Sequence, residues 1–213
     1  MYGPQVFLRH DAEAIAGLIA AHPLAVLAAR GPEGVVVAHA PLLAERDEEG
    51  RIVGLWGHVA RANPFARLAD GAACVAVFVG PDAYVSPSAY PSKAAHGRVV
   101  PTWNYIRAEV EGRVTCFDDA ASLEAVVSAL TDQMEADRAK PWAFSDAPAD
   151  YRAGMLGGVV GVRISIAAAE GKWKLSQNRA AEDAAGVMAD LGRRAEPRAQ
   201  AIRRAMETSR SED

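Results

Sequence analysis

The sequence predicts a mainly β fold of the α+β class, in which an antiparallel β-barrel is decorated by α-helices. The strand-like runs are residues 24–29, 35–44, 52–58, 73–79, 105–117 and 159–168. The first three are joined by tight turns rich in Gly, Pro, Asp and Glu, which is typical of a meander and not of parallel βαβ units. Later runs alternate apolar and polar residues, as half-buried strands do. Strands of this number, with helices around them, are expected to close into one barrel.

Helical patterns lie before, between and after these strands. Asp11 is a favourable N-cap for a helix that ends at His22, and Asn63 followed by Pro64 is a favourable start for a short helix. The remaining helical patterns are expected at residues 123–134, 148–155, 183–191 and 197–206. We therefore expect one domain spanning residues 1–213, with a C-terminal helical segment at about 180–207.

The composition excludes several classes of protein. Of the 213 residues, 50% are hydrophobic and 23% are charged, with a net charge of −4, so no global basic field attracts nucleic acid. No apolar run approaches the ~20 residues of a membrane span, and the N-terminus lacks the pattern of a signal peptide. Cys74 and Cys116 lie in apolar runs, which favours buried, reduced thiols without a metal site. A cytoplasmic protein is expected.

The stretch 80–105 combines prolines with aromatic and polar side chains. Pro87, Pro91 and Pro101 each fix φ and remove a backbone donor, so we expect an irregular, stiffened loop and neither a helix nor a continuous strand. Long loops in compact domains are often functional, which favours a ligand site. The alternative is a structural crossover whose aromatic side chains merely pack.

Two further segments gather polar residues. His58 and Arg61 come directly before the Asn63–Pro64 helix start, where backbone donors and a guanidinium favour an anion site. A capped helix beside an exposed arginine is the alternative. Residues 171–179 surround a tryptophan with basic and amide side chains, and there the alternative is a solvated basic turn.

Three motifs then point to a known family. GHVARANP, YVSPSAYPSK with VVPTWNY, and GKWKLSQNR, in this order and spacing, closely resemble the FMN-binding negative transcriptional regulator family of PaiB-like proteins. The resemblance covers nearly the whole chain. It implies a split β-barrel, a homodimer, and FMN bound where two subunits meet.

The resemblance also suggests which residues bind the cofactor. His58 and Arg61, with the helix start at Asn63, would meet the phosphate, while Trp103 would form a wall for the flavin ring. A cation near the ring would stabilise reduced flavin, and the candidates are Lys93, Lys174 and Arg179. The complete set of expected cofactor-binding residues is His58, Val59, Ala60, Arg61, Asn63, Lys93, Thr102, Trp103, Asn104, Lys174, Gln177 and Arg179.

The function implied is that of an FMN-binding protein of the PaiB-like regulator family. Neither the net charge nor a helix-turn-helix pattern supports direct DNA contact. One alternative is a flavin-dependent oxidoreductase acting on a small molecule, whose chemistry would be the cofactor's, because no catalytic side-chain constellation is evident. The other is a haem-handling split barrel, with His39, His58 or His96 as axial ligand.

Overall fold

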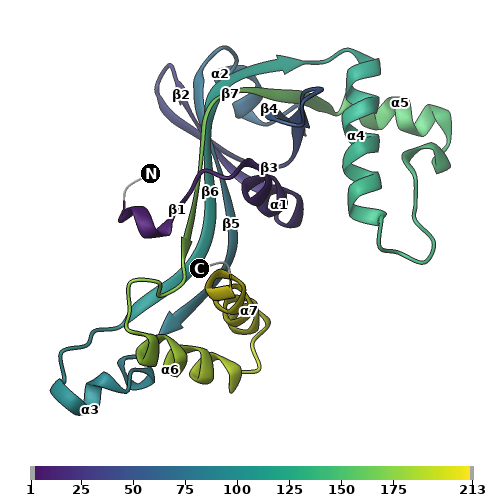
Figure 1. The fold of residues 1–213 in the computed structure, drawn as a ribbon. Helices are drawn as coiled ribbons and strands as arrows, with labels where there is room; N and C mark the ends of the chain where they lie inside the picture. Colours follow the sequence, from purple (N-terminus) through teal and green to yellow (C-terminus); the bar gives the residue numbers. More distant parts are fainter. Residues whose placement is uncertain (1–2, 212–213) are drawn as a thin grey trace. The chain divides into compact units, whose positions relative to one another are not determined.

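The protein, described here by a computed structural model of residues 3–211, forms two compact units. Unit 1 contains residues 3–10, 79–107 and 170–211, and unit 2 contains residues 11–78 and 108–169. Three long strands, β5, β6 and β7, run through both units (Figure 1). The terminal two residues at each end of the expected domain lie outside the described residues, and its boundaries stay a prediction.

The strands and helices follow the expected order along the chain. The strands are β1 Leu8–Arg9, β2 Leu24–Gly31, β3 Gly34–Arg46, β4 Ile52–Ala60, β5 Ala73–Val85, β6 Thr102–Phe117 and β7 Val159–Lys174. The α-helices are α1 Ala12–Ala21, α2 Pro64–Leu68, α3 Ser92–His96, α4 Ala120–Glu135, α5 Ala149–Gly157, α6 Ala181–Gly192 and α7 Pro197–Ser211. Short 3₁₀ turns are η1 Gln5–Phe7, η2 Pro87–Ala89 and η3 Phe144–Asp146.

The sheet closes on itself through β7. Its strand order is β1-β7-β4-β3-β2-β5-β6, and β7 pairs in addition with β6. In unit 2 the pairs β2–β3, β2–β5, β3–β4 and β4–β7 are antiparallel. The predicted antiparallel barrel with surrounding helices is therefore confirmed. None of the helices within residues 3–211 is long and apolar enough to cross a membrane.

Pro41 lies inside β3, although a proline is usually found at a sheet edge or a strand end. The strand changes its partner there: Pro41 is the last β3 residue in the ladder with β2, opposite Leu24, and the ladder with β4 begins at Leu42. The missing N–H of proline thus falls where one ladder ends, so a proline is tolerated in a strand that has neighbours on both sides.

The stretch 80–105 is more regular than expected. The strand β5 continues to Val85, and β6 already begins at Thr102, so the connection is only residues 86–101. That connection contains η2 and the single-turn helix α3, which ends at Gly97 with a left-handed φ of 67°. The prediction of an irregular loop without a helix is wrong because the prolines stand at turn starts, where a fixed φ favours a turn.

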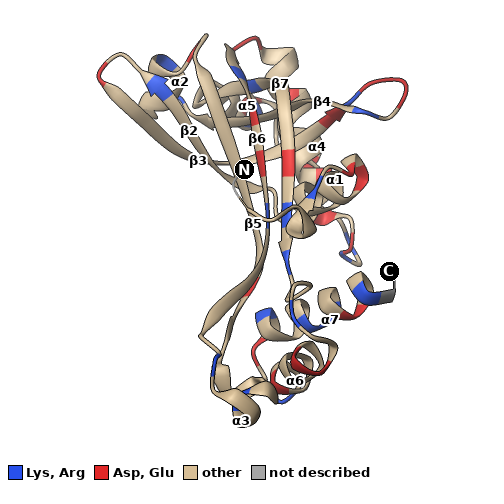
Figure 2. Ribbon diagram, turned by 60° about the vertical axis from the view of Figure 1, so that its left-hand side comes forward, with Lys and Arg blue, Asp and Glu red and all other residues tan. Residues whose placement is uncertain are grey.

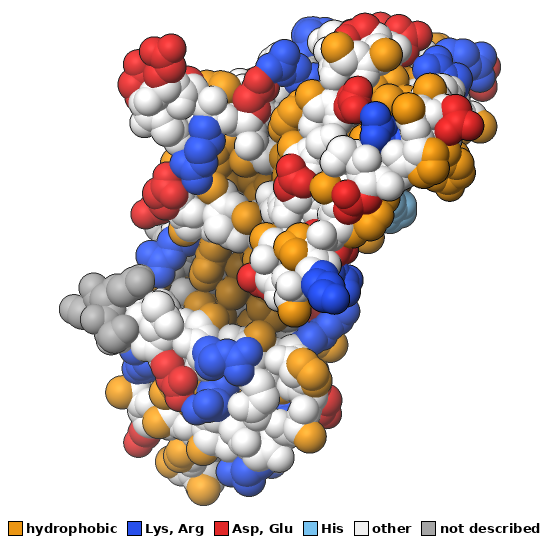
Figure 3. All heavy atoms as spheres, turned by 90° about the vertical axis from the view of Figure 1, so that its right-hand side faces the viewer, with side chains coloured by type: hydrophobic (Ala, Val, Ile, Leu, Met, Phe, Trp, Pro, Cys, Tyr) orange, Lys and Arg blue, Asp and Glu red, His pale blue; other side chains and the backbone are white. Residues whose placement is uncertain are grey.

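In unit 2, α4 packs against the outside of the barrel. Asp119 caps it by accepting a hydrogen bond from Ser122 N at 2.9 Å. Val126 and Leu130 are buried against Leu43, and Leu123 packs with Phe144 and Leu156 near α5. Figure 3 shows that the face carrying α4 and α5 mixes apolar, acidic and basic side chains.

In unit 1, α6 and α7 form a helical hairpin, and they account for the predicted C-terminal helical segment. Val187, Leu191 and Ile202 are buried, and they lie on these two helices. Gly186 is required for close packing, because a Cβ there would lie 2.2 Å from the carbonyl oxygen of Ala89. Acidic and basic segments alternate over this hairpin (Figure 2).

The close approach of β3 and β4 gives a test of the barrel. A Cβ on Gly57 would lie 2.1 Å from the carbonyl oxygen of Pro41, so Gly57→Ala must displace backbone. Overpacking of this kind lowers the free energy of unfolding by roughly 1–3 kcal/mol. Urea unfolding measures the change. Gly17→Ala is the matched control, because that site in α1 is open and alanine should stabilise the helix by about 0.5–1 kcal/mol. Equal stability of the two variants would contradict the close approach.

Candidate functional site

The first group of predicted site residues lies in unit 2, at the corner between β4 and α2. His58, Val59 and Ala60 end β4 and pair with Gly161, Val160 and Val159 of β7. Asn63 then caps α2 as predicted, its Oδ1 accepting a hydrogen bond from Phe65 N at 3.0 Å. These residues are held in place by the β4–β7 ladder and by the buried Phe65.

Arg61 extends from this corner toward the junction of α5 and β7. Its Nε donates to the carbonyl oxygen of Gly157 at 2.8 Å, and one Nη donates to that of Val159 at 3.0 Å. The other Nη lies 3.5 Å from an oxygen of Asp118. Two of the three guanidinium nitrogens therefore hold the protein backbone, and the third faces an exposed carboxylate.

His58 has an unusual environment for a strand residue. Its Nδ1 is buried and has no hydrogen-bond partner in the described part of the chain. Burial lowers the pKa of the His58 imidazole below its ordinary value of 6.5, so the ring is neutral at neutral pH. A buried polar atom without a partner is costly, and a ligand that supplies one would relieve that cost.

The second group lies in unit 1, where Lys174 joins the ends of β6 and β7. Its Nζ donates to the carbonyl oxygen of Trp103 at 2.8 Å and to Oγ1 of Thr102. It also lies 5.9 Å from the centre of the Tyr105 ring. Within residues 3–211 no carboxylate lies at ion-pair distance from this Nζ. Burial lowers the pKa of the Lys174 ammonium, and Lys172 nearby acts in the same direction.

An aromatic surface accompanies this cation. Trp103 is 52% exposed although it is a large aromatic residue in a strand. Tyr84 packs against it edge-on, with ring centroids 5.8 Å apart and an interplanar angle of 70°. Sequence reasoning missed Tyr84, because it assigned residues after Val79 to a loop; the continuous strand β5 places it beside β6. An exposed indole, on the residue whose carbonyl oxygen accepts from an ammonium without a carboxylate partner, suits a flat anionic ligand.

Asn104 is fully buried and bonded within the protein. Its Nδ2 donates to Ser176 Oγ at 3.0 Å and contacts the sulfur of Met206 at 3.6 Å. Ser176 donates back to Oδ1 at 3.2 Å. Ser176 also holds a left-handed φ of 64°, which is uncommon outside glycine. This network fixes the turn after β7, so Asn104 positions that turn, and its direct contact with a cofactor stays a prediction.

The other members of the second group shape the same turn and its surroundings. Gln177 accepts a hydrogen bond from Leu175 N at 2.7 Å and donates to the carbonyl oxygen of Trp173 at 2.6 Å. The Arg179 guanidinium lies 4.9 Å from the ring centre of the buried Tyr90. Lys93 donates to Ser88 Oγ at 3.1 Å and is exposed. Of the three candidate cations, Lys174 contacts Thr102 and Trp103 directly. Lys93 contacts Ser88 instead, and Arg179 contacts Tyr90.

Each group, taken by itself, offers donors of the kind that one part of FMN requires. The unit 2 group offers a buried unpartnered imidazole nitrogen and a guanidinium. The unit 1 group offers an ammonium without a carboxylate partner and an exposed indole. A phosphate requires cationic or N–H donors, and a flavin ring requires an aromatic or apolar surface with a few polar partners. Within residues 3–211 no cluster of His, Cys, Asp or Glu is arranged to hold a metal ion.

Comparison with known proteins agrees with this chemistry. The family model described as "Putative FMN-binding domain" matches residues 1–168. The protease synthase and sporulation protein PAI 2 of Bacillus subtilis is 28% identical over 208 residues, which cover 97% of each chain. Uncharacterized proteins of Emericella nidulans and Aspergillus fumigatus are 32% and 33% identical, each over 63% of this chain. The present chain covers 64% of the length of these two fungal relatives.

Solved structures resemble the fold at low sequence identity. The FAD and heme binding protein of Mycobacterium smegmatis matches with a TM-score of 0.57 and 19% identity, over 84% of this chain and 78% of that one. The flavocytochrome Anf3 of Azotobacter vinelandii matches with a TM-score of 0.56 and 16% identity, over 78% and 69%. The split β-barrel implied by the sequence motifs is confirmed as the fold.

The buried His58 makes stability depend on pH. Because its pKa is lower in the folded protein than the unfolded value of 6.5, the unfolded chain binds more protons as the pH falls through that window. The contribution of neutral His58 to the free energy of unfolding is therefore fully present above about pH 6.5. It decreases as the pH falls toward the lowered pKa. Thermal unfolding at several pH values between about 5 and 8 measures this. His58→Gln should flatten the dependence of stability on pH. His39→Gln is the control, because His39 is exposed, and this variant should show the same dependence as the wild type. An unchanged slope in His58→Gln would contradict the assignment.

Proposed function

Because this chain belongs to the FMN-binding family of PaiB-like split-barrel proteins, we propose that it works as a homodimeric flavoprotein of the regulator type. FMN is its cofactor, as the family model and the donor chemistry agree. The observation that carries the proposal is the Lys174 ammonium, whose hydrogen-bond partners are neutral oxygens, one of them the carbonyl oxygen of the exposed Trp103. When bound, FMN supplies one- and two-electron transfer chemistry.

We assign the flavin ring to the unit 1 group. Trp103 offers the apolar surface, and Thr102 and Lys174 offer polar partners for the ring edge. The positive charge of Lys174 is not neutralised by a carboxylate in the described part of the chain, so it is available to an electron-rich ring. Lys174 is thus the cation that we propose to tune the reduced flavin. Gln177 and Asn104 hold the turn that follows Lys174, and we propose that they act by positioning.

We assign the phosphate to the unit 2 group. Arg61 is fixed in orientation by two backbone carbonyls, which limits the side-chain entropy lost when a ligand binds. Its remaining Nη lies near only the exposed Asp118, which a phosphate would replace as the acceptor. His58 contributes a neutral imidazole with an unused nitrogen. Val59, Ala60 and Asn63 shape the backbone of this corner, and Lys93 and Arg179 stay as further candidates.

A homodimer is supported by an apolar outer face in unit 2. The strand β3 carries Val35 and Val37, which are 75% and 54% exposed, and its neighbour β2 carries Leu24, which is 65% exposed. Val26 and Ala28 lie between them, opposite Val77 and Val75 of β5. Contiguous apolar surface of this kind usually marks an interface, and a stable dimer of this type buries on the order of 2,000 Å².

A role in regulation is proposed without direct DNA contact by this chain. The relative PAI 2 carries a name that refers to protease synthesis and sporulation. In the α6–α7 hairpin, however, most arginines are paired: Arg194 with Asp190, Arg198 with Asp82, and Arg203 with Glu207. Paired guanidiniums contribute little to phosphate binding, which depends on net positive charge.

A cytoplasmic location is consistent with the two thiols. Cys74 and Cys116 are free, so the described residues contain no disulfide. Burial raises the pKa of each thiol to about 11, and both are therefore protonated at neutral pH. Free thiols without a disulfide are usual in a reducing compartment.

The alternatives have less support from the geometry. A flavin-dependent oxidoreductase would use the same cofactor contacts, and NADH oxidation by the FMN-loaded protein tests it. For haem, His96 is a poor axial ligand, because its Nδ1 accepts a hydrogen bond from Arg98 N at 3.0 Å. A neutral imidazole that accepts at Nδ1 carries its proton on Nε2, which then cannot ligate iron.

Titration of two ligands into two variants tests the cofactor assignment. Lys174→Met removes a ring contact, so it should weaken FMN and riboflavin alike, by roughly tenfold or more. Arg61→Ala removes a phosphate contact, so it should weaken FMN by about 10- to 150-fold and leave riboflavin nearly unchanged. Quenching of flavin fluorescence measures both dissociation constants.

The outcomes separate cofactor binding from the residue assignments. If the wild-type protein shows no flavin bands after incubation with FMN, the proposed function fails. If FMN binds but Arg61→Ala weakens both ligands equally, Arg61 does not contact the phosphate. Lys174→Arg keeps a positive charge and is the matched control for Lys174→Met.

The apolar outer face predicts the oligomeric state. The wild-type protein should sediment as a dimer at micromolar concentration, and Val37→Glu should shift it to a monomer, because a charge cannot be buried without a partner. Val53→Glu is the matched control, since Val53 is 44% exposed on β4 and outside that face. A wild-type monomer, or a dimer that survives Val37→Glu, would exclude this face as the interface.

A further inference from the structure

Unit 2 contains a cavity of about 590 Å³ that belongs to neither group of predicted cofactor residues. It lies between the ends of β3 and β4, the outer faces of β6 and β7, and the first turns of α4. Trp56 and Phe117 provide its aromatic walls, and Glu45, Arg46 and Arg163 provide its charged rim. Its volume is within the range of pockets that hold small organic ligands.

The cavity is shaped by two glycines on adjacent strands. A Cβ on Gly161 would lie 2.1 Å from the Phe117 ring, so glycine allows this ring to lie against β7. A Cβ on Gly54 would lie 2.7 Å from Oε2 of Glu45, so glycine allows Glu45 to reach across β4 to Arg163. Both the aromatic wall and the charged rim therefore depend on positions without a side chain.

The charged rim is balanced in net charge, but it keeps one unused hydrogen-bond donor. The guanidinium of Arg163 donates from Nε to Oε2 of Glu45 at 2.8 Å and from one Nη to Oε1. Its other Nη has no hydrogen bond or ion pair within residues 3–211. Arg46 also lines the cavity, and its own partner, Glu13, comes from α1 outside it. Each of these two guanidiniums is thus paired with a carboxylate, and one Nη of Arg163 is left as an unused donor facing the cavity.

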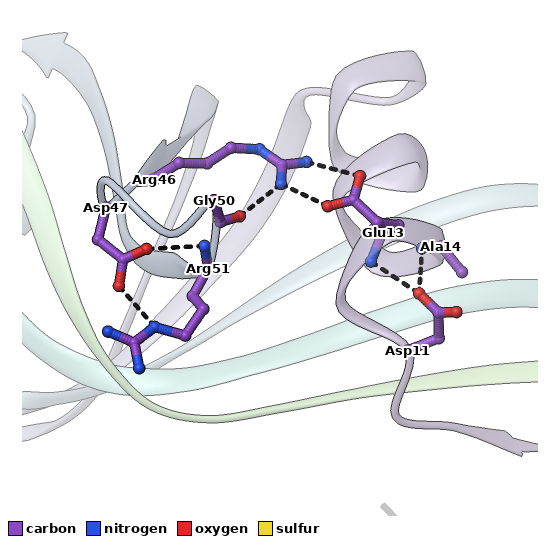
Figure 4. A network of polar contacts seen from close by, with 7 residues as sticks. All are labelled: Asp11, Glu13, Ala14, Arg46, Asp47, Gly50 and Arg51. Atoms are coloured by element: carbon purple, nitrogen blue, oxygen red, sulfur yellow. Dashed lines mark hydrogen bonds and ion pairs between the residues drawn. The ribbon is translucent and has the colours of Figure 1, made fainter.

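Figure 4 shows how firmly Arg46 is held. One Nη donates to Glu13 Oε1 and to the carbonyl oxygen of Gly50, each at 2.6 Å, and the other donates to Glu13 Oε2 at 3.2 Å. The adjacent turn is closed by Asp47, which accepts from the backbone and the side chain of Arg51. The guanidinium side of the cavity is therefore preorganised, which reduces the entropy lost when a ligand binds.

We propose that this cavity binds a small aromatic carboxylate, as a second site separate from the flavin site. The aromatic ring of the ligand packs on Trp56 and Phe117. Its carboxylate accepts a hydrogen bond from the free Nη of Arg163, next to Arg46. The hydroxyl of Ser122 at the start of α4 offers a further polar partner at the rim. An aromatic ammonium ion of the same size cannot accept the hydrogen bond from Arg163.

The test uses a matched pair of probes on the full-length protein. By isothermal titration calorimetry, 2-naphthoate should bind with a dissociation constant on the order of millimolar or tighter. The protonated 2-naphthylmethylamine should bind at least about tenfold more weakly, because an ammonium cannot accept a hydrogen bond from the free Nη of Arg163. FMN added beforehand should leave the naphthoate affinity unchanged, since the two sites share no residue.

Two variants locate the probe in the cavity. Arg163→Gln should weaken naphthoate about tenfold or more, by removing the charged donor. Ala125→Trp fills the cavity from an exposed position on α4, and it should abolish binding without removing any polar contact. Ala121→Trp is the matched control on the same helix, exposed and outside the cavity lining, and it should bind naphthoate like the wild type.

Several results would overturn the proposal. These are no binding of naphthoate, equal binding of the amine, or unchanged binding in Ala125→Trp. Displacement of naphthoate by FMN would place the probe in the flavin site instead. Failure of FMN to bind at all would leave the proposal intact and would count against the proposed function alone.

Discussion

Pairing of β7 on both of its edges is the constraint on which the rest of the structure depends. One edge pairs with β4 and the other with β6, so the same strand closes the barrel. Closure brings backbones unusually close, and glycines stand where a side chain has no room: a Cβ on Gly112 of β6 would lie 2.3 Å from the carbonyl oxygen of Ser165 in β7. Because β7 then continues to Lys174, barrel closure also fixes where the candidate ring contacts begin.

Local features of the site could be predicted from the sequence, and long-range ones could not. Asn63 followed by Pro64 signals a helix start through its own chemistry, and the structure has that cap. Arg61, in contrast, donates to carbonyls 96 and 98 residues away in the sequence. Backbone carbonyls carry no residue-specific signal, so no motif could have indicated this contact. The burial of Asn104 could not be predicted for the same reason. It results from contacts with Ser176 and with Met206 of α7, which lie far from Asn104 in the sequence.

Misjudged strand ends have a common physical origin. Proline was taken to exclude a helix in residues 80–105, and Pro41 stands within a strand that is paired on both sides. In both places the missing N–H coincides with a position where no ladder or helix bond is needed: a change of partner strand in β3, and the start of η2 or α3. The sequence shows where a proline stands. Only the pairing of the strands and turns shows whether its missing N–H leaves a hydrogen bond unmade and so lowers stability.

The pairing of β4 with β7 also sets an order of events in folding. Gly54 lies opposite Ser165, so barrel closure waits for a strand that a ribosome adds more than a hundred residues later. Long-range pairing of this kind is slow to form, and a chain is synthesised at about 5–20 residues per second. The turn after β7 further requires Met206 of α7 for its buried contacts. A nascent chain therefore lacks part of the candidate cofactor contacts until α7 has been synthesised.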